Sequence, residues 1–198
     1  MLNEISQPSN FASSIISELE HDQSVLDLGC GNGRDSLYFL SHDLKVTGVD
    51  ASDIAIQKLS TLTQDNPNAK FICGDFVTDD LIYNSQYDYV YSRFTLHAIN
   101  DIQEVVLLKN VTRALKNGGK FFIEARTIHD DLFGMGENLG GNMFMYDNHF
   151  RRFINPDELK STLENLGFEI MSFAEGRGFS KTNNSDPVLL RITAKLRD

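Results

Sequence analysis

Hydrophobic residues recur along this chain as short apolar runs separated by longer segments with helical spacing. The runs have lengths typical of β-strands and cover residues 24–28, 45–50, 69–73, 86–91, 120–126, 168–173 and 187–196. The segments between the first five runs, and the one before the sixth, place apolar residues three and four positions apart. The segment before the fifth run predicts a helix over about residues 101–116. This alternation predicts an α/β fold, with a doubly wound, mostly parallel sheet of seven strands and helices on both faces.

The runs at 24–28, 86–91 and 120–126 are almost continuously apolar, which favours parallel strands buried on both faces. The last two runs are joined by a polar loop that has no helical pattern. A connection without a crossover helix predicts that the last strand is antiparallel.

The two segments outside this rhythm are residues 1–22 and 127–153. Residues 1–22 predict one helical segment, with Phe11 and Leu19 among its buried positions and Ser9 or Asn10 as the N-cap. It covers the sheet or, as a second possibility, forms a lid over a ligand. Residues 127–153 are too long for an ordinary connection and predict a lid or substrate loop. We expect residues 1–198 to form a single domain.

The densest motif follows the first strand, where Gly29, Gly31 and Gly33 alternate with other residues and a helix pattern begins at Arg34. Glycines allow positive φ and a close approach of the backbone to a ligand. The start of a helix adds unpaired N–H groups. The spacing is G-x-G-x-G and not the G-x-G-x-x-G of dinucleotide-binding proteins. A glycine-rich turn without a ligand is the structural alternative.

With Asp27 the motif reads D-x-G-x-G-x-G, and in this the sequence resembles class I S-adenosylmethionine-dependent methyltransferases. Asp50 at the end of the second strand, Gly74-Asp75 after the third and the Leu-Lys-Asn-Gly-Gly-Lys stretch before the fifth extend the resemblance over nearly the whole chain. The resemblance implies S-adenosyl-L-methionine as the cofactor. The contacts that we expect for it are Asp27, Gly29, Cys30, Gly31, Gly33, Arg34, Asp50, Ala51, Asp75, Phe76 and Ser92.

The two later acids have structural alternatives. In the family, the acid at Asp50 binds the ribose hydroxyls, and the acid at Asp75 receives the adenine amino group while Phe76 packs on the purine. Either carboxylate could instead cap a helix, although Ser52 or Asp53 could replace Asp50 in that role.

The formal net charge is −10, which argues against non-specific binding to nucleic acid. There is no apolar run of membrane-spanning length and no signal pattern, so we expect no membrane partner. Cys30 and Cys73 look like small buried residues of a reducing compartment, which predicts a cytoplasmic protein. The pattern does not give the oligomeric state.

Arginine is concentrated where ligands of such folds bind, at the carboxyl ends of the strands. The residues concerned are Arg34, Arg93, Arg126, Arg151, Arg152 and Arg177. We therefore expect a small anionic acceptor, a phosphorylated or acidic metabolite or sugar, with O-methylation favoured. As substrate contacts we expect Arg126, His149, Arg152 and Arg177, and we expect a catalytic role for Arg93. These arginines could instead pair with loop acids such as Asp130 and Asp131, and in a strand only one of Arg151 and Arg152 can face the site.

His97 follows the fourth strand and is a candidate general base, with burial in the core as the alternative. His129, Asp130, Asp131 and His149 do not have a recognised metal-ligand spacing, so we expect no metal. A weaker similarity to small bacterial capsule and surface-polysaccharide methyltransferases, carried by residues 92–94 and 149–153, favours sugars or phosphates.

Two other functions remain open on the sequence. A nicotinamide-dependent oxidoreductase shares the glycine turn and Asp50, but the chain lacks the third-glycine spacing and has no Tyr-x-x-x-Lys pair. A non-catalytic regulator that binds the cofactor is compatible with every motif.

Overall fold

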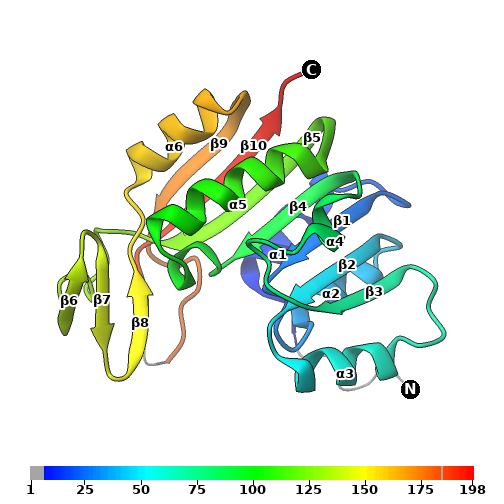
Figure 1. The fold of residues 1–198 in the computed structure, drawn as a ribbon, viewed down its shortest axis with the longest axis horizontal. Helices are drawn as coiled ribbons and strands as arrows, with labels where there is room; N and C mark the ends of the chain where they lie inside the picture. The colour runs from blue at the N-terminus through cyan, green and yellow to red at the C-terminus, as the bar shows by residue number, and fades with distance from the viewer. Residues whose placement is uncertain (1–6, 184) are drawn as a thin grey trace.

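The computed structural model describes residues 7–183 and 185–198, and its centre is a seven-stranded sheet (Figure 1). The strand order is β3-β2-β1-β4-β5-β10-β9. The strands are β1 (Ser24–Leu28), β2 (Lys45–Asp50), β3 (Ala69–Cys73), β4 (Tyr87–Arg93), β5 (Leu115–Arg126), β9 (Phe168–Gly176) and β10 (Leu189–Leu196). Only β10 runs against its neighbours β5 and β9, which confirms the predicted antiparallel last strand.

Helices cover both faces of this sheet. The helices are α1 (Asn10–Ile15), α2 (Arg34–Leu40), α3 (Asp53–Leu62), α4 (Asp80–Tyr83), α5 (Asp101–Ala114) and α6 (Pro156–Asn165), with 3₁₀ turns η1 (Ile16–Glu18) and η2 (Leu96–Ala98). Alternation along the strands sorts the core: Leu26 packs in the cluster with α4, α5 and α6, whereas Val25 packs in the cluster with α1 and α2. Buried residues of α3 form a third cluster with Cys30.

Two predicted helix ends need correction. Residues 7–22 do not form one continuous helix, because α1 ends at Ile15, a 3₁₀ turn follows, and Leu19 is extended; residues 1–6 lie outside the described part. Ser9 is the N-cap of α1, as predicted. The helix predicted over 101–116 ends at Ala114 because Leu115 is already extended and pairs with Tyr87 in the sheet.

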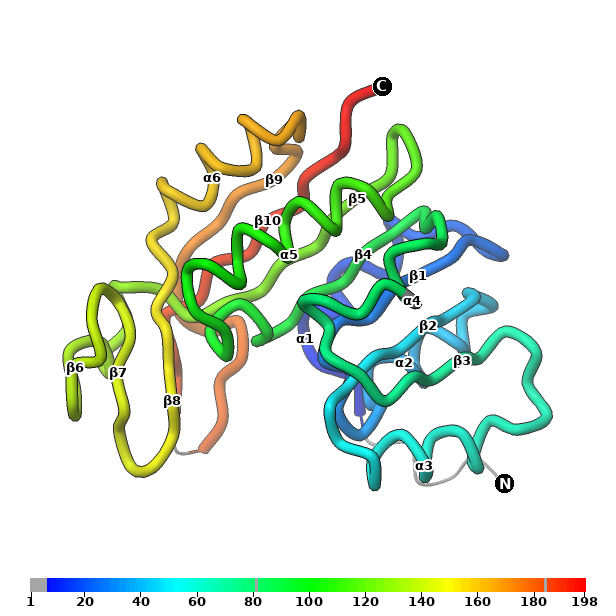
Figure 2. Tube along the Cα trace, in the orientation of Figure 1, coloured from blue at the N-terminus to red at the C-terminus, as the bar shows by residue number. Residues whose placement is uncertain are grey.

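The segment 127–153 is not the long irregular loop that we expected. It contains a second sheet of three antiparallel strands, β6 (Glu137–Gly140), β7 (Met143–Tyr146) and β8 (His149–Arg152). Asp147 and Asn148, both with positive φ, make the two-residue turn between β7 and β8. Figure 2 shows this small sheet beyond the end of the large one, where a parallel bridge from Thr127 to Ile154 attaches it.

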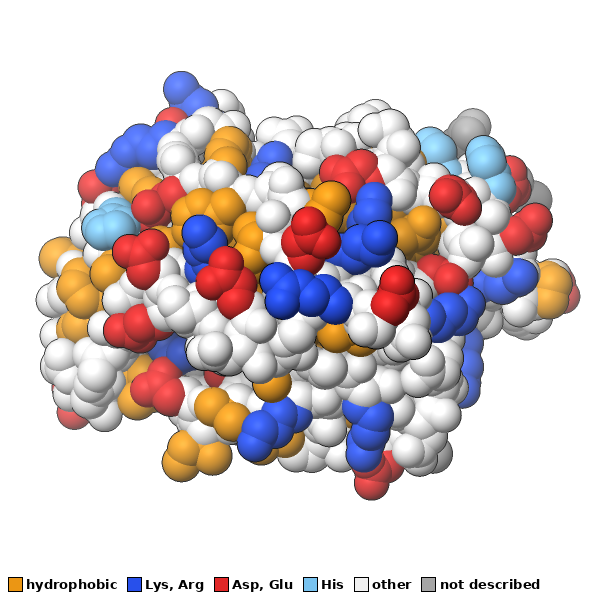
Figure 3. Space-filling view, turned by 90° about the horizontal axis from the view of Figure 1, so that it is seen from above, with side chains coloured by type: hydrophobic (Ala, Val, Ile, Leu, Met, Phe, Trp, Pro, Cys, Tyr) orange, Lys and Arg blue, Asp and Glu red, His pale blue; other side chains and the backbone are white. Residues whose placement is uncertain are grey.

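The described residues contain no helix that is both long enough and apolar enough to cross a membrane. On the face seen in Figure 3, Lys and Arg side chains are interspersed with Asp and Glu. Cys30 and Cys73 are both free, but Cys73 is exposed, so the expectation that both are buried was wrong for this residue.

Candidate functional site: a glycine cleft and an arginine pocket

The glycine turn after β1 takes a conformation that other residues rarely adopt. Gly29, Gly31 and Gly33 have φ of +66°, +55° and +76°. A Cβ added to Gly33 would lie 2.2 Å from Leu59, and one added to Gly29 would lie 2.6 Å from Thr95. A Cβ on Gly31 would meet nothing within 4 Å. The outer two glycines are therefore required by packing, and the middle one leaves bare backbone beside open space.

That open space is a cleft of about 220 Å³. Its lining comprises Asp27, Gly29, Cys30, Gly31, Asn32, Arg34, Asp35, Tyr91 and Arg93. Five of the eleven cofactor residues expected from the sequence, Asp27, Gly29, Cys30, Gly31 and Arg34, thus lie together in one cleft. The carboxylates of Asp27 and Asp35 line this cleft, and that of Asp50 accepts a hydrogen bond from the N–H of Gly31, which also lines it.

Asp27 is the most perturbed acid of the cleft. It is 3% exposed, and burial raises the pKa of its carboxyl from 3.8 to about 7. A hydrogen bond from the Ser36 hydroxyl opposes this rise, and the charges of Asp35 and Asp50 add to it. The cleft thus favours a cationic ligand group, which would lower the pKa of Asp27 again.

Asp50 fixes the glycine turn from the end of β2. Its Oδ2 accepts from the N–H of Gly31 at 2.8 Å, and its Oδ1 accepts from the N–H of Ser52 at 2.9 Å. Ser52 is the N-cap of α3, so Asp50 is not needed to cap that helix. Ala51, between them, is exposed beside the same edge.

Asp75 and Phe76 lie across from the glycine turn. The carboxylate of Asp75 accepts from the N–H of Val77 at 2.8 Å and the hydroxyl of Thr78 at 2.9 Å, so it caps the turn that follows β3. The ring of Phe76 stands 3.8 Å from the position of a Cβ on Gly29. The apolar ring therefore borders the cleft, while the capping alternative for Asp75 is realised in this conformation.

Ser92 does not line the cleft. It is fully buried, and its hydroxyl shares a hydrogen bond of 2.5 Å with that of Thr95. The expected cofactor contact by Ser92 is thus corrected: the residue supports the chain beneath the site.

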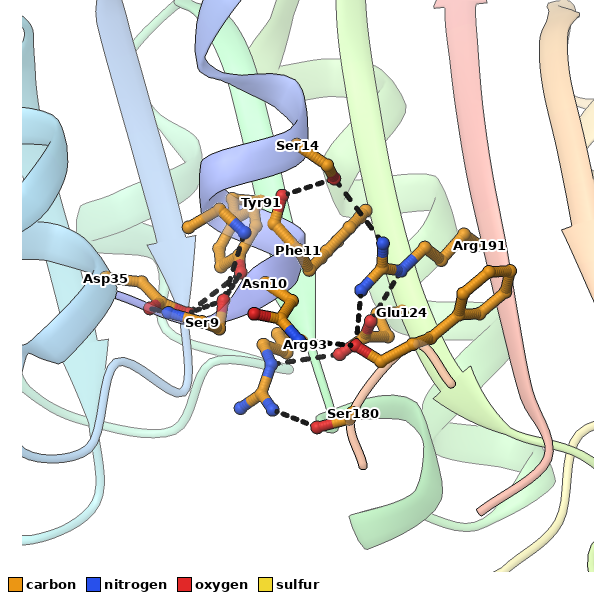
Figure 4. A network of polar contacts seen from close by, with 12 residues as sticks. Ser9, Asn10, Phe11, Ser14, Asp35, Tyr91, Arg93, Glu124, Ser180 and Arg191 are labelled. Atoms are coloured by element: carbon orange, nitrogen blue, oxygen red, sulfur yellow. Dashed lines mark hydrogen bonds and ion pairs between the residues drawn. The ribbon is translucent and has the colours of Figure 1, made fainter. Parts of the chain in front are cut away.

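A network of polar contacts closes one side of the cleft (Figure 4). The N–H and hydroxyl of Ser9 donate to the two carboxylate oxygens of Asp35 at 2.8 Å each, and the Tyr91 hydroxyl donates to Asp35 at 2.9 Å. The start of α1 is thereby tied to the start of α2 at the edge of the cleft. The same segment covers the sheet through Phe11 and Ile15, so the two sequence hypotheses for it are compatible.

Arg93 sits at the end of β4, in a row of charges that crosses three strands. Its Nε donates to buried Glu124 at 2.9 Å, and Arg191 donates to the other oxygen of Glu124 at 2.7 Å. The Arg93 guanidinium also lies 4.2 Å from the centre of the Phe94 ring. Arg93 is thus held by Glu124 and marks the border between the cleft and a second cavity.

This second cavity, the arginine pocket, has a volume of about 350 Å³. Its lining comprises Phe94, His97, Arg126, His149, Phe150 and Arg151. No acidic residue is among them, so the pocket favours an anionic ligand. It joins the end of β5, the η2 turn and strand β8, which are far apart in the sequence.

His97 lies in this pocket as an uncharged imidazole. Burial lowers the pKa of His97 from 6.5 to about 4, and Arg126, Arg151, Arg93 and Arg152 lower it further through their charges. Its Nδ1 is buried and lacks a hydrogen-bond partner among the described residues.

Arg152 was predicted as a substrate contact, and the structure corrects this. It is 5% exposed, and its guanidinium donates to the backbone carbonyl of Leu96 and to the carboxylates of Asp101 and Glu104. Alternation along β8 instead turns Arg151 into the pocket, where it donates to the Tyr146 carbonyl at 2.7 Å. Of Arg151 and Arg152, only Arg151 lines the arginine pocket, as the alternation of side chains in a strand predicts.

The pairing of arginines with loop acids is realised at two positions. Arg126 donates to Asp130 at 2.7 Å, and Arg177 donates to Asp131 at 2.7 Å. Arg126 still lines the pocket, but Arg177 lines neither cavity, and its ion pair is exposed. The expected substrate contact by Arg177 is therefore not supported.

The comparisons with known proteins agree with this geometry. A family model described as "Methyltransferase domain" matches residues 25–119. A solved structure of a SAM-dependent methyltransferase from Methanosarcina mazei is 21% identical and covers 93% of this chain and 97% of that one, with a TM-score of 0.80. Residues 25–119 are therefore similar to a methyltransferase domain, and the chain has the fold of a SAM-dependent methyltransferase.

A curated relative and a second solved structure are also similar to this chain. Phosphoethanolamine N-methyltransferase of Triticum aestivum is 25% identical over 174 residues, which cover 87% of this chain and 30% of that protein. The structure of 1,6-didemethyltoxoflavin-N1-methyltransferase from Burkholderia thailandensis, with S-adenosylhomocysteine bound, is 20% identical and covers 94% of this chain and 76% of that one, at a TM-score of 0.74. The chain spans between 30% and 41% of the length of three curated relatives that it matches.

His129, Asp130 and Asp131, weighed above as metal ligands, each pair with a different side chain. His129 pairs with Glu175 at 2.8 Å, while Asp130 and Asp131 pair with arginines. Over residues 7–183 and 185–198, no group of three or more His, Cys, Asp or Glu side chains could hold an ion.

Sequence reasoning missed several residues that line the glycine cleft and the arginine pocket. Asp35 and Tyr91 were read only as parts of a helix and a strand, although the two-residue alternation of Tyr89 and Tyr91 puts them on one face. Phe150 was also missed, and the choice between Arg151 and Arg152 was left open. Both depend on the β7–β8 turn, whose Asp147-Asn148 pair is a hairpin signal.

Proposed function

We propose that the protein transfers a methyl group from S-adenosylmethionine to a small anionic acceptor. The observation that carries the proposal is the different character of two adjoining cavities, which meet at Arg93 and Phe94. The cleft has Asp27 and Asp35 in its lining beside two arginines, whereas the arginine pocket has no acid in its lining. The cofactor supplies an activated methyl group on a cationic sulfur, and the protein mainly positions and desolvates the reacting atoms.

The residues of the glycine cleft fit this cofactor. The space beside Gly31 admits a ligand against bare backbone, and Asp27 favours a cationic group such as an ammonium or a sulfonium. Asp50 and Phe76 flank the cleft at positions suited to a ribose and a purine. The glycine spacing is G-x-G-x-G and not the G-x-G-x-x-G of dinucleotide-binding proteins. The nicotinamide alternative is therefore disfavoured.

The arginine pocket supports the acceptor class. Two arginines and two histidines line it without an acid, and Arg151 has no carboxylate partner in the described chain. The wheat relative is named for phosphoethanolamine, which carries a phosphate, and this agrees with an anionic acceptor. A hydroxyl on such a molecule could pass its proton to His97, so we favour O-methylation.

The first experiment is calorimetric titration with S-adenosylhomocysteine and, separately, with NADH. We expect micromolar binding of the first and none of the second. Affinity for NADH alone would overturn the cofactor assignment.

The second experiment is a methyl-transfer assay on matched acceptor pairs that differ only in a phosphate or carboxylate. We expect kcat/KM to be at least about tenfold higher for the charged member, since a charged hydrogen bond contributes about 1.5–3 kcal/mol. Equal values within each pair would refute the anionic class. Cofactor binding without transfer to any acceptor in cell extracts would favour the non-catalytic regulator.

A further inference from the structure

His97 is a candidate base with no acid behind it. Its Nδ1 is buried without a hydrogen-bond partner in the described chain, while the residue lines the arginine pocket. Nε2 is therefore the nitrogen that can reach a bound acceptor. Catalytic histidines usually have a carboxylate on the far nitrogen, which orients the ring and stabilises its protonated form. Among the described residues, no carboxylate contacts Nδ1 of His97.

The charges around His97 make its protonation harder still. The groups that face it or its pocket come from every neighbouring element: Arg93 from β4, Arg126 from β5, and His149, Arg151 and Arg152 from β8, with Glu124, Asp130, Asp101 and Glu104 held against these arginines. The four charges that lower the pKa of His97 most are those of arginines, so His97 is a weak base in this pocket.

The two pocket arginines are fixed in place but retain donors. Arg126 is anchored by one Nη to Asp130, and Arg151 by one Nη to the Tyr146 carbonyl, each at 2.7 Å. Their remaining N–H groups can chelate a carboxylate, phosphate or sulfate. Because Arg126 ends β5 and Arg151 lies on β8, an anion between them would bridge the two sheets.

From these contacts we infer that the acceptor's own anionic group binds between Arg126 and Arg151 and supplies the negative charge that lets His97 act as a base. The inference rests on the proposed function, and it narrows the acceptor to a molecule that carries a phosphate or carboxylate close to the hydroxyl that is methylated. An uncharged analogue leaves His97 unable to accept the proton.

The proton and electron balance of the step is simple. A lone pair of the acceptor oxygen forms the new bond to the methyl carbon, and the pair of the breaking carbon–sulfur bond stays on sulfur. The hydroxyl proton passes to Nε2 of His97. When the methylated anion leaves, the arginines again destabilise the imidazolium, which returns its proton to water.

The test is NMR titration of ¹⁵N-histidine-labelled protein with sulfate as the probe, against chloride at equal ionic strength. The chain has five histidines, and a His97→Gln variant assigns the resonance. Without sulfate, His97 should stay neutral down to about pH 5. With sulfate, its titration midpoint should rise by about 1–2 pH units, as expected for a new charge a few ångströms away.

Variants at the two arginines sharpen the test. Arg126→Gln and Arg151→Gln should each raise the midpoint in chloride and remove most of the sulfate-induced shift. Arg113→Gln is the matched control, because Arg113 also pairs with an aspartate, Asp80, but on the exposed surface away from the pocket. It should change neither value. A midpoint near 6.5 without sulfate, or one that sulfate leaves unmoved, would overturn the inference.

Kinetics separate this inference from the proposed function. The pKa that limits kcat belongs to the acceptor complex and that of kcat/KM to the free species, so the pKa seen in kcat should be the higher for His97. Sulfate shifts without any methyl transfer would sink the proposed function and leave the anion site standing. Methyl transfer with a His97 that is insensitive to sulfate would sink the inference alone.

Discussion

Asp27 and His97 are buried titratable groups on the two sides of Arg93, and their environments are electrically opposite. Burial and two neighbouring acids raise the pKa of Asp27, while burial and four arginines lower the pKa of His97. Each group is thus biased toward its neutral form, and each would regain charge if a ligand of opposite sign arrived. The comparison shows that neither group has a balancing charge beside it. The environment of Asp27 favours a cationic ligand, and that of His97 favours an anionic one.

The two cavities also differ in what builds them. The cleft depends on backbone conformation within one short turn, whereas the pocket depends on side chains from η2, β5 and β8. Changes in the cleft should therefore act on folding and cofactor binding together. Changes in the pocket should separate stability from acceptor recognition.

The largest effect is expected for Gly33→Ala, which tests the backbone-built side. A left-handed alanine costs about 1–2 kcal/mol, and the clash with buried Leu59 adds about 1–3 kcal/mol. Unfolding in urea should show a loss of about 2–5 kcal/mol. Gly31→Ala is the control: with no clash, it should lose only about 1–2 kcal/mol while still weakening binding of S-adenosylhomocysteine. Equal losses would refute the packing argument.

Asp27→Asn tests the environment of Asp27 in the cleft through pH. The pKa of Asp27 is about 7 in the folded protein and 3.8 for an ordinary aspartate, as in the unfolded chain. Between about pH 4 and 7 the folded state therefore keeps a proton that the unfolded state releases. The contribution of Asp27 to stability is therefore lost as pH rises through 7. The variant should be more stable by up to about 4 kcal/mol at pH 8 and by less than half of that at pH 5. A gain that is the same at both pH values would contradict the assignment.

Arg152→Met tests whether β8 separates anchoring from recognition. The change leaves the Leu96 carbonyl and Glu104 without their partner, so we expect a loss of about 2–3 kcal/mol, reduced because Asp101 is 65% exposed. Arg151→Met should leave thermal unfolding nearly unchanged and raise the acceptor KM. If the two variants behave alike, the assignment of opposite faces is wrong.

The smallest effect is expected for Arg177→Met. Its ion pair with Asp131 is exposed and lies outside both cavities, so neither the melting temperature nor the acceptor KM should change measurably. A clear rise in KM would return Arg177 to the acceptor site.

The cleft was predictable from sequence because its information is local. The bounds of β1, β2 and β3 follow from apolar runs, and the conformations of Gly29 to Gly33 follow from residue type alone. What failed was detail that depends on packing: Ser92 is adjacent to the cleft in sequence, yet its side chain points beneath it.

The pocket was less predictable because its information is distributed. The sequence showed that one of Arg151 and Arg152 would face the site, but the choice depends on how β8 pairs with β7. Arg126 was ambiguous for another reason: it both pairs with Asp130 and lines the pocket, so the two hypotheses did not exclude each other.

The two-residue turn at Asp147 and Asn148 determines which arginine does which job. Side chains alternate along a strand, so a single residue added to or removed from this turn would exchange the two neighbours on β8. The former anchor would then enter the cavity while the former contact replaced it beneath. On the proposed function, a change of one residue in this turn would alter acceptor recognition and leave the large sheet untouched.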